Sequence, residues 1–187
     1  TLTADQMAGF SATTLPAIAG VFKNIPTDSL SGITSKAIVG LPVKSLTIDQ
    51  VKALDGASQL SALSAAQVAT LSKAQILAIA DDDIATLNLS ATVITNVDST
   101  KFDNLSNAQI KALTTAQIAG LNAAQISAIT ADQAANFTAA QAPAFKALTG
   151  LSDSIVIPNL DKSFVSAIPT KTFAALTGDQ LTALTED

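Results

Sequence analysis

Residues 105–144 read LSNAQIKA, LTTAQIAG, LNAAQISA, ITADQAAN and FTAAQAPA, five blocks of eight residues joined without a gap. Each block opens on an apolar residue, has Ser, Thr or Asn second, and has Gln fifth. Self-similarity at a fixed short period is the signature of a repeat protein. We therefore take this octad as the unit of the fold.

Copies of the octad extend over most of the chain. A variant with Pro second occurs as IPTDSLSG at 25–32 and IPTKTFAA at 168–175. Close copies lie at 2–9, 46–53, 63–70, 71–78 and 176–183, and weaker ones at 10–17, 33–40 and 79–86. The octad predicts a single repeat array over 1–187, with blocks 1–87, 105–148 and 160–187.

Two stretches, 88–104 and 149–159, lack the octad. The first is rich in β-branched residues, and residues 154–157 of the second form a short run that we expect to be extended. We predict that both are irregular corners of one continuous superhelix. Three separate domains is the weaker reading, because the last block is too small to fold alone.

A period of eight fits neither a long helix nor a strand. An α-helix advances about 100° per residue, so each octad would leave the apolar stripe about 80° out of register. In a strand, positions one and six would face opposite sides of the sheet. Each octad must therefore bend back at its ends, which predicts an all-α chain of very short helices.

The polar residues of the octad supply a helix start. With Ser or Thr at position two as the N-cap, Gln at position five becomes N3, which gives a capping box. Thr114 with Gln117, and Ser72 with Gln75, are the pairs we single out. The apolar residues at positions one and six then form a hydrophobic staple across the helix start.

Proline and glycine mark the ends of each unit. Pro26 and Pro169 fall at the helix start, where a missing N–H costs nothing. Glycines at position eight suit a left-handed residue after the helix, and we expect this of Gly9, Gly32, Gly40 and Gly120. Helices of one to two turns are unstable alone, so the octads should stack as a superhelical α-solenoid.

Composition excludes several functions. The 187 residues include 15 acids and 10 bases, all Lys, for a net charge of −5, and contain no His or Cys. Ser-His-Asp catalysis, a structural zinc site and disulfides are thereby excluded. Acidic character argues against nucleic acid, and no apolar run is long enough to span a membrane. We expect no enzyme activity and no cofactor.

One acidic run is a metal candidate. Asp81, Asp82 and Asp83 supply the oxygen ligands that Ca²⁺ prefers. The alternative is that they occupy the first turn of the 79–86 helix, where acids favour the positive end of the dipole. No calcium-loop motif surrounds them, so we favour the alternative. The glutamine column could likewise bind sugar, but the capping box explains it better.

The octads resemble a known class of repeat. Tandems of LTxxQIxA and IPxxAFxG occur in large secreted or surface-displayed proteins of bacteria and some protists. A more distant resemblance is to the superhelical repeats of the mesothelin and stereocilin group. The resemblance implies a spacer or scaffold that lies outside the cell or on its surface.

The sequence starts on an octad, and residues 184–187 open another. We therefore predict sticky terminal faces that bind head to tail or carry further repeats of a longer chain. The contact candidates are Leu2, Met7, Phe10, Leu181 and Leu184. The expected function is an extracellular structural protein: a surface spacer, an adhesin stalk or a filament subunit. The alternative is a solenoid binding module for a cell-surface protein or glycan.

Overall fold

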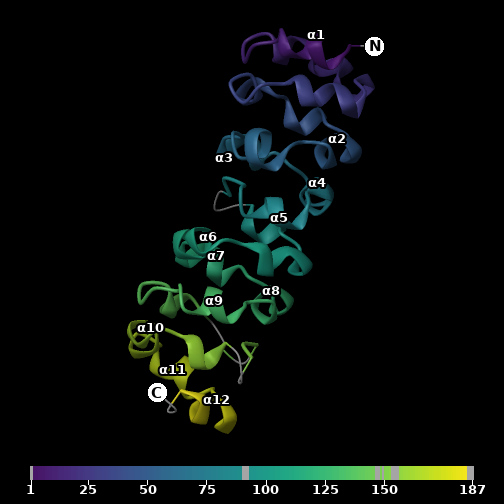
Figure 1. The fold of residues 1–187 in the computed structure, drawn as a ribbon. Coiled ribbons are helices and arrows are strands. Elements are labelled where there is room, and N and C mark those ends of the chain that lie inside the picture. The colour runs from purple at the N-terminus through teal and green to yellow at the C-terminus, as the bar shows by residue number, and fades with distance from the viewer. Residues whose placement is uncertain (1, 90–92, 146–147, 149, 153–155, 185–187) are drawn as a thin grey trace. The chain divides into compact units, whose positions relative to one another are not determined.

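The computed structural model describes residues 2–89, 93–145, 148, 150–152 and 156–184. These residues form short helices joined by corners, and no β-strand occurs among them (Figure 1). The prediction of an all-α chain is therefore confirmed for the described part. None of its helices is long and apolar enough to cross a bilayer.

The chain divides into two compact units, Thr1–Val97 and Asp98–Asp187. Their boundary falls inside the 88–104 stretch that lacks the octad. The helices of the first unit are α1 (Ala4–Ala8), η1 (Leu15–Asn24), η2 (Thr27–Gly32), η3 (Ile38–Gly40), η4 (Val43–Ser45), α2 (Ile48–Lys52), η5 (Gly56–Leu60), α3 (Ala65–Val68), α4 (Lys73–Ala78), α5 (Asp81–Ile84) and η6 (Ile94–Asn96). Of these, η5 is a π-helix and the other η elements are 3₁₀-helices.

The second unit continues in the same style, with 3₁₀-helices as its η elements. Its helices are η7 (Ser99–Asn104), α6 (Asn107–Ala112), α7 (Thr115–Ala119), α8 (Ala123–Ser127), α9 (Ala131–Ala134), η8 (Ala142–Ala144), η9 (Ile157–Asn159), α10 (Lys162–Ser166), α11 (Thr170–Phe173) and α12 (Gly178–Ala183). Each α-helix has four to six residues, which is little more than one turn.

The apolar positions of the octad form the core. Position-six residues such as Ile76 and Ile110 are fully buried, and position-one residues such as Leu71 and Leu105 are nearly so. The chain turns at position one, between the end of one helix and the cap of the next. Residues there adopt extended backbone, as Leu105 does with φ −66° and ψ 132°. In the second unit, the rings of Phe137, Phe145 and Phe164 pack with centroids 5.0 to 6.0 Å apart.

The expected left-handed glycines are a wrong prediction. No described residue has a positive φ, and Gly9 and Gly120 are right-handed at φ −77° and −91°. Gly32 and Gly40 are required for a different reason. A Cβ on Gly32 would lie 1.9 Å from the Ala4 carbonyl oxygen, and one on Gly40 would lie 2.0 Å from that of Ala12. Glycine here permits close approach of two backbone segments.

The two stretches without octads also contain helices. The segment 88–104 holds η6 and η7, despite its β-branched residues. In the run 154–157, Val156 is right-handed helical and Ile157 begins η9, so the expected extended run is wrong for these two. Residues 154 and 155 lie outside the described residues.

Candidate functional site

The most regular polar feature is the glutamine at octad position five. Gln133 illustrates its geometry. Its Oε1 accepts from the backbone N–H of Thr130, 3.1 Å away, while the Thr130 hydroxyl accepts from the Gln133 N–H at 3.3 Å. Its Nε2 donates to the carbonyls of Phe102 and Leu105, at 2.9 and 3.0 Å. One side chain therefore closes its own helix start and fastens that helix to an earlier part of the chain.

Glutamines of both units make this second contact, with acceptors 25 to 32 residues earlier. They include Gln50, Gln59, Gln67, Gln75, Gln133, Gln141 and Gln180. Their acceptors are in most cases the position-six carbonyl of one octad and the position-one carbonyl of the next. Within each unit the chain therefore returns over itself, and we call each such round a tier.

The proline octads use a different donor. Pro26 and Pro169 stand at the N-cap and have no N–H, so no side-chain acceptor is needed there. Position five is accordingly a hydroxyl. The Ser29 hydroxyl donates to the Leu2 carbonyl at 2.6 Å, and that of Thr172 to the Phe145 carbonyl at 3.4 Å. The proline octads therefore keep the hydrogen bond to an earlier tier but lack the side-chain hydrogen bond at the cap.

Residues 54–62, LDGASQLSA, are a nine-residue version of the unit, which the eight-residue pattern does not detect. The extra residue is absorbed by the π-helix η5. Gln59 still accepts from the Asp55 N–H and still donates to two earlier carbonyls, those of Leu30 and Ile33. A π turn adds one residue per helical turn, so an insertion can be accommodated without losing either contact.

The two predicted cap pairs have capping-box hydrogen bonds. The Thr114 N–H donates to Gln117 Oε1 at 2.6 Å, and the Ser72 N–H donates to Gln75 Oε1 at 2.8 Å. What sequence reasoning missed is the donor role of the amide. A signal for it exists: a capping box accepts Glu or Gln equally, yet the chain's one Glu is Glu186, outside this position. Glu could accept at the cap, but as a carboxylate it cannot donate.

The acidic run Asp81–83 forms the first turn of α5. The Asp83 carboxylate lies against Gly56 of η5, where a Cβ would meet its Oδ1 at 1.7 Å. Among the described residues, no group of three or more acidic side chains is arranged to hold a metal ion.

Two carboxyl groups, those of Asp55 and Asp161, have a pKa below the ordinary value for Asp. The Ser58 hydroxyl and then its N–H donate to Asp55 and hold the pKa of that carboxyl below its ordinary value. Asp161 has a lowered pKa for the same reason, through the hydroxyl and N–H of Ser163. Both residues are N-caps, of η5 and α10. Their shifts reflect capping, which stabilises the charged form.

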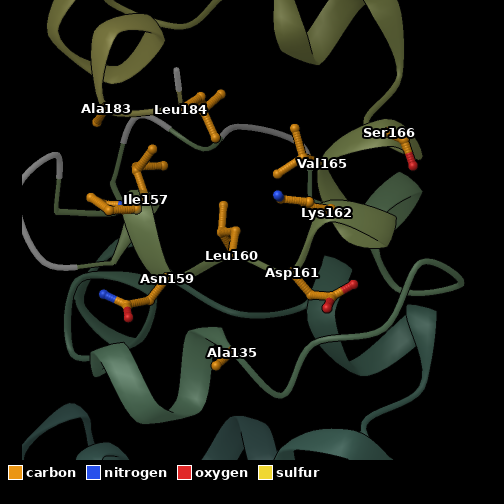
Figure 2. Close-up of a pocket in the computed structure, with 11 residues that line it drawn as sticks. Ala135, Ile157, Asn159, Leu160, Asp161, Lys162, Val165, Ser166, Ala183 and Leu184 are labelled. Carbon is orange, nitrogen blue, oxygen red and sulfur yellow. The ribbon is translucent and has the colours of Figure 1, made fainter. Parts of the chain in front are cut away.

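A hollow of about 610 Å³ opens in the second unit. Its wall mixes apolar side chains, among them Ile157, Leu160 and Leu184, with polar residues that include Asn159 and Ser166 (Figure 2). The ammonium group of Lys162 points into the space between these side chains, whereas the Asp161 carboxylate points away from it (Figure 2).

The residues proposed for the terminal faces differ in exposure. Leu2 and Phe10 are half-buried, Leu181 is 38% exposed and Leu184 is half-buried. Met7 is fully buried and has no surface with which to contact a partner, which corrects the prediction that it is a terminal contact residue. As a position-six residue, it packs inward. Leu184 is right-handed at the end of α12, so it does not start a new octad, and residues 185–187 lie outside the described part.

Comparison with known proteins supports the repeat. Residues 102–144 match the model of the ALTTAQ repeat, a motif that the chain spells at 112–117. No curated protein matches the chain. The chain is thus a helical repeat protein, similar over this part to the ALTTAQ repeats.

Proposed function

We propose that this chain is a non-enzymatic structural protein, a superhelical α-solenoid that serves as a spacer, stalk or filament subunit. The observation that carries the proposal is the glutamine contact between tiers. Gln50, Gln125 and Gln180 are at most 2% exposed, so the most repeated polar group of the sequence is used inside the protein. Because the same hydrogen-bonded contact repeats from one tier to the next, each added tier lengthens the molecule, and length is what a spacer requires.

The hydrogen bonding of the interior supports the same proposal. In the part of the chain that is described, no buried side-chain nitrogen or oxygen lacks a hydrogen-bond partner. The resolved pKa shifts, those of Asp55 and Asp161, arise from helix caps on the surface. A catalytic acid or base is more often marked by burial or by a neighbouring charge.

Deletion of whole octads tests the structural role. Removing 113–128 takes out two octads and brings equivalent residues into the vacated contacts, so we expect a folded, shorter protein. Removing 113–124 shifts the register by half an octad and should abolish cooperative melting, measured by circular dichroism. Equal loss of structure in both deletions would identify an ordinary globular domain and contradict the proposal.

We further propose that the protein acts outside the cell or on its surface, where the secreted repeat proteins that the octads resemble are found. Protease treatment of intact source cells, followed by immunoblotting, tests this. Digestion without cell lysis is expected. Protection until the cells are lysed would place the protein inside and contradict the proposal.

A binding module is the second candidate, and the hollow beside Lys162 favours it. A wall of mixed apolar and polar side chains with one inward-pointing cation suits a partner that combines an apolar group with a negative charge. On this alternative the array is a scaffold for one binding surface. Binding of a cell-surface protein or glycan that is lost when Lys162 is changed to Glu would favour it over a pure spacer.

A further inference from the structure

We propose that the first unit carries two complementary faces, a lysine column and an aspartate column, and that a second copy of this chain docks its aspartate column on the lysine column of the first. Copies then associate side by side. The proposal rests on the structural role above and assigns the contact that joins subunits. The lysine column consists of η1, η4, α2 and α4 with Lys23, Lys44, Lys52 and Lys73, and the aspartate column of α1, η2, η5 and α5 with Asp5, Asp28, Asp55, Asp81, Asp82 and Asp83.

The elements of the lysine column are stacked on one another. Within the first unit, η4 packs against η1, and α4 packs against α2. Gln50 of α2 donates to the Phe22 carbonyl of η1. Gln75 of α4 donates to the Val43 carbonyl of η4. Figure 1 shows α4 below α2 on the same side of this unit. Residues from three successive tiers therefore share one surface.

This surface is basic and partly apolar. Its lysines are four of the five in the first unit, and all four are exposed, whereas Asp49 is the one acid within these described elements. The same elements expose three large apolar side chains, because Val21, Ile48 and Leu77 are 52%, 51% and 46% exposed. Exposed apolar side chains bordered by charges of one sign are typical of a docking surface, and here the partner must be acidic.

The aspartate column has the opposite character. Here α1 packs against η2 and α5 against η5, and Gln59 of η5 donates to the Leu30 carbonyl of η2. The column holds six of the seven aspartates of the first unit, and no lysine lies within these described elements. Exposed residues beside the acids are small, such as Ala8, Ser31 and Ala57. Small side chains leave room for the apolar side chains of the lysine column.

The two columns share one spacing, because the same tiers build both. Successive rounds of the chain carry Asp5 with Lys23, Asp28 with Lys44 and Lys52, and Asp55 with Lys73. Two parallel copies therefore place a lysine opposite an aspartate in tier after tier. This match in period favours a second copy over a lipid surface, whose charges have no fixed spacing. The contact joins different faces, so it is heterologous and adds further copies.

Sedimentation equilibrium of the full chain across concentration, at low salt, tests the contact. Lys23→Glu with Lys52→Glu makes the lysine column acidic, and Asp5→Lys with Asp28→Lys makes the aspartate column basic. Each double variant brings like charges together and should associate about tenfold more weakly or worse than wild type. Added salt should weaken wild-type association too, because exposed charges are screened.

The matched control is Lys36→Glu with Lys111→Glu, two exposed lysines outside the column. It changes the net charge as the first double variant does and should associate as wild type does. An equal loss of association in this control would mean that net charge alone governs the behaviour, and would overturn the contact.

Mixing the two double variants gives the sharpest result. The acidic lysine column of one now matches the basic aspartate column of the other, so the mixture should regain the association that each variant lacks alone. A wild type that is monomeric throughout, or a mixture that regains nothing, would overturn the contact. A monomeric wild type that cosediments with phosphatidylglycerol vesicles would do so too, and would assign the lysine column to a lipid surface. A monomeric chain that still tolerates deletion of 113–128 would reject the contact and leave the structural role standing.

Discussion

At the scale of the residue, the position-five glutamines that reach an earlier tier act as crosslinks between segments of backbone. A carboxamide has one acceptor oxygen and two N–H donors. In Gln50 all are used: Oε1 accepts from the Thr47 N–H at 3.0 Å, and Nε2 donates to the Phe22 and Ile25 carbonyls at 2.7 and 2.8 Å. No other uncharged side chain except Asn offers this combination, and Asn is one methylene shorter.

Comparing Gln133→Ala with Gln6→Ala isolates the contact between tiers. Both substitutions remove the cap bond that Oε1 accepts from the threonine N–H and keep the one that the backbone N–H donates, but only Gln133 also donates to two buried carbonyls. We expect Gln133→Ala to lower the free energy of unfolding by about 2 kcal/mol more than Gln6→Ala. Urea denaturation at a concentration where the chain is monomeric measures both. Equal losses would mean that the second contact contributes nothing to stability.

Replacing Gln133 by Glu predicts a pH dependence. The carboxylate keeps the cap acceptor but places negative charge against the Phe102 and Leu105 carbonyls, so burial there should raise its pKa in the folded state. The variant is then destabilised at neutral pH, above the unfolded pKa, and recovers as pH falls through the folded pKa. The chain has no His, so wild type and Gln133→Ala should change little from about pH 7 to pH 5. A Glu variant with the same pH profile as Gln133→Ala would contradict the geometry.

Sequence reasoning reaches part of this residue-scale picture. The spacing of Thr114 and Gln117 is enough to predict a cap, because a capping box is a local pattern. The acceptors of Gln133, at Phe102 and Leu105, lie about 30 residues away and depend on how the chain returns. No local rule specifies that distance. The absence of Glu from position five was the available indication.

At the scale of the element, the octad sets a unit of about one helical turn. Helices this short are unstable alone, so each depends on its cap and on its neighbours. Weak copies of the octad, which lack the Ser/Thr and Gln pair, form either a 3₁₀ segment, as η3 in 33–40, or an α-helix, as α5 in 79–86. The repeat predicts where each element begins. It does not predict the helix type, since the two proline octads, neither of which has a side-chain cap bond, form the 3₁₀-helix η2 and the α-helix α11.

Glycine at the end of an element gives a matched prediction. Gly40→Ala would press a Cβ into the Ala12 carbonyl, and because that neighbour is backbone it cannot move aside. We expect a loss of about 2 kcal/mol. Gly20→Ala, in η1, meets nothing within 4 Å and should stabilise by about 0.5 kcal/mol, because alanine restricts the unfolded chain. Thermal melting compares the two.

A neutral Gly40→Ala would contradict the close approach of Gly40 to Ala12, and a strongly destabilising Gly20→Ala would contradict the open space at Gly20. The expectation from sequence, that glycine follows each helix in a left-handed conformation, failed because it considered one helix at a time. The constraint comes from a neighbouring segment 28 residues away in the chain.

At the scale of the whole molecule, each unit consists of stacked tiers that repeat one hydrogen-bonding scheme. The predicted all-α repeat follows from the octad alone, since a period of eight excludes a long helix and a strand. The number of octads per tier does not follow, because it depends on corner geometry. Corners vary: Gln50 reaches back 25 and 28 residues, and Gln75 reaches back 29 and 32.

Disulfide trapping tests the return of the chain over itself most directly. A Cβ on Gly150 would lie 3.7 Å from the Cβ of Ile126, within the range of about 3.5–4.5 Å that a disulfide needs. The chain has no Cys, so Ile126→Cys with Gly150→Cys introduces the only pair. Ile126→Cys with Gly178→Cys is the control, because nothing lies within 4 Å of a Cβ on Gly178. The account predicts that mild oxidation converts the first pair to an intramolecular disulfide, seen by mass spectrometry, and leaves the control reduced. A first pair that stays reduced, or two pairs that oxidise alike, would contradict it.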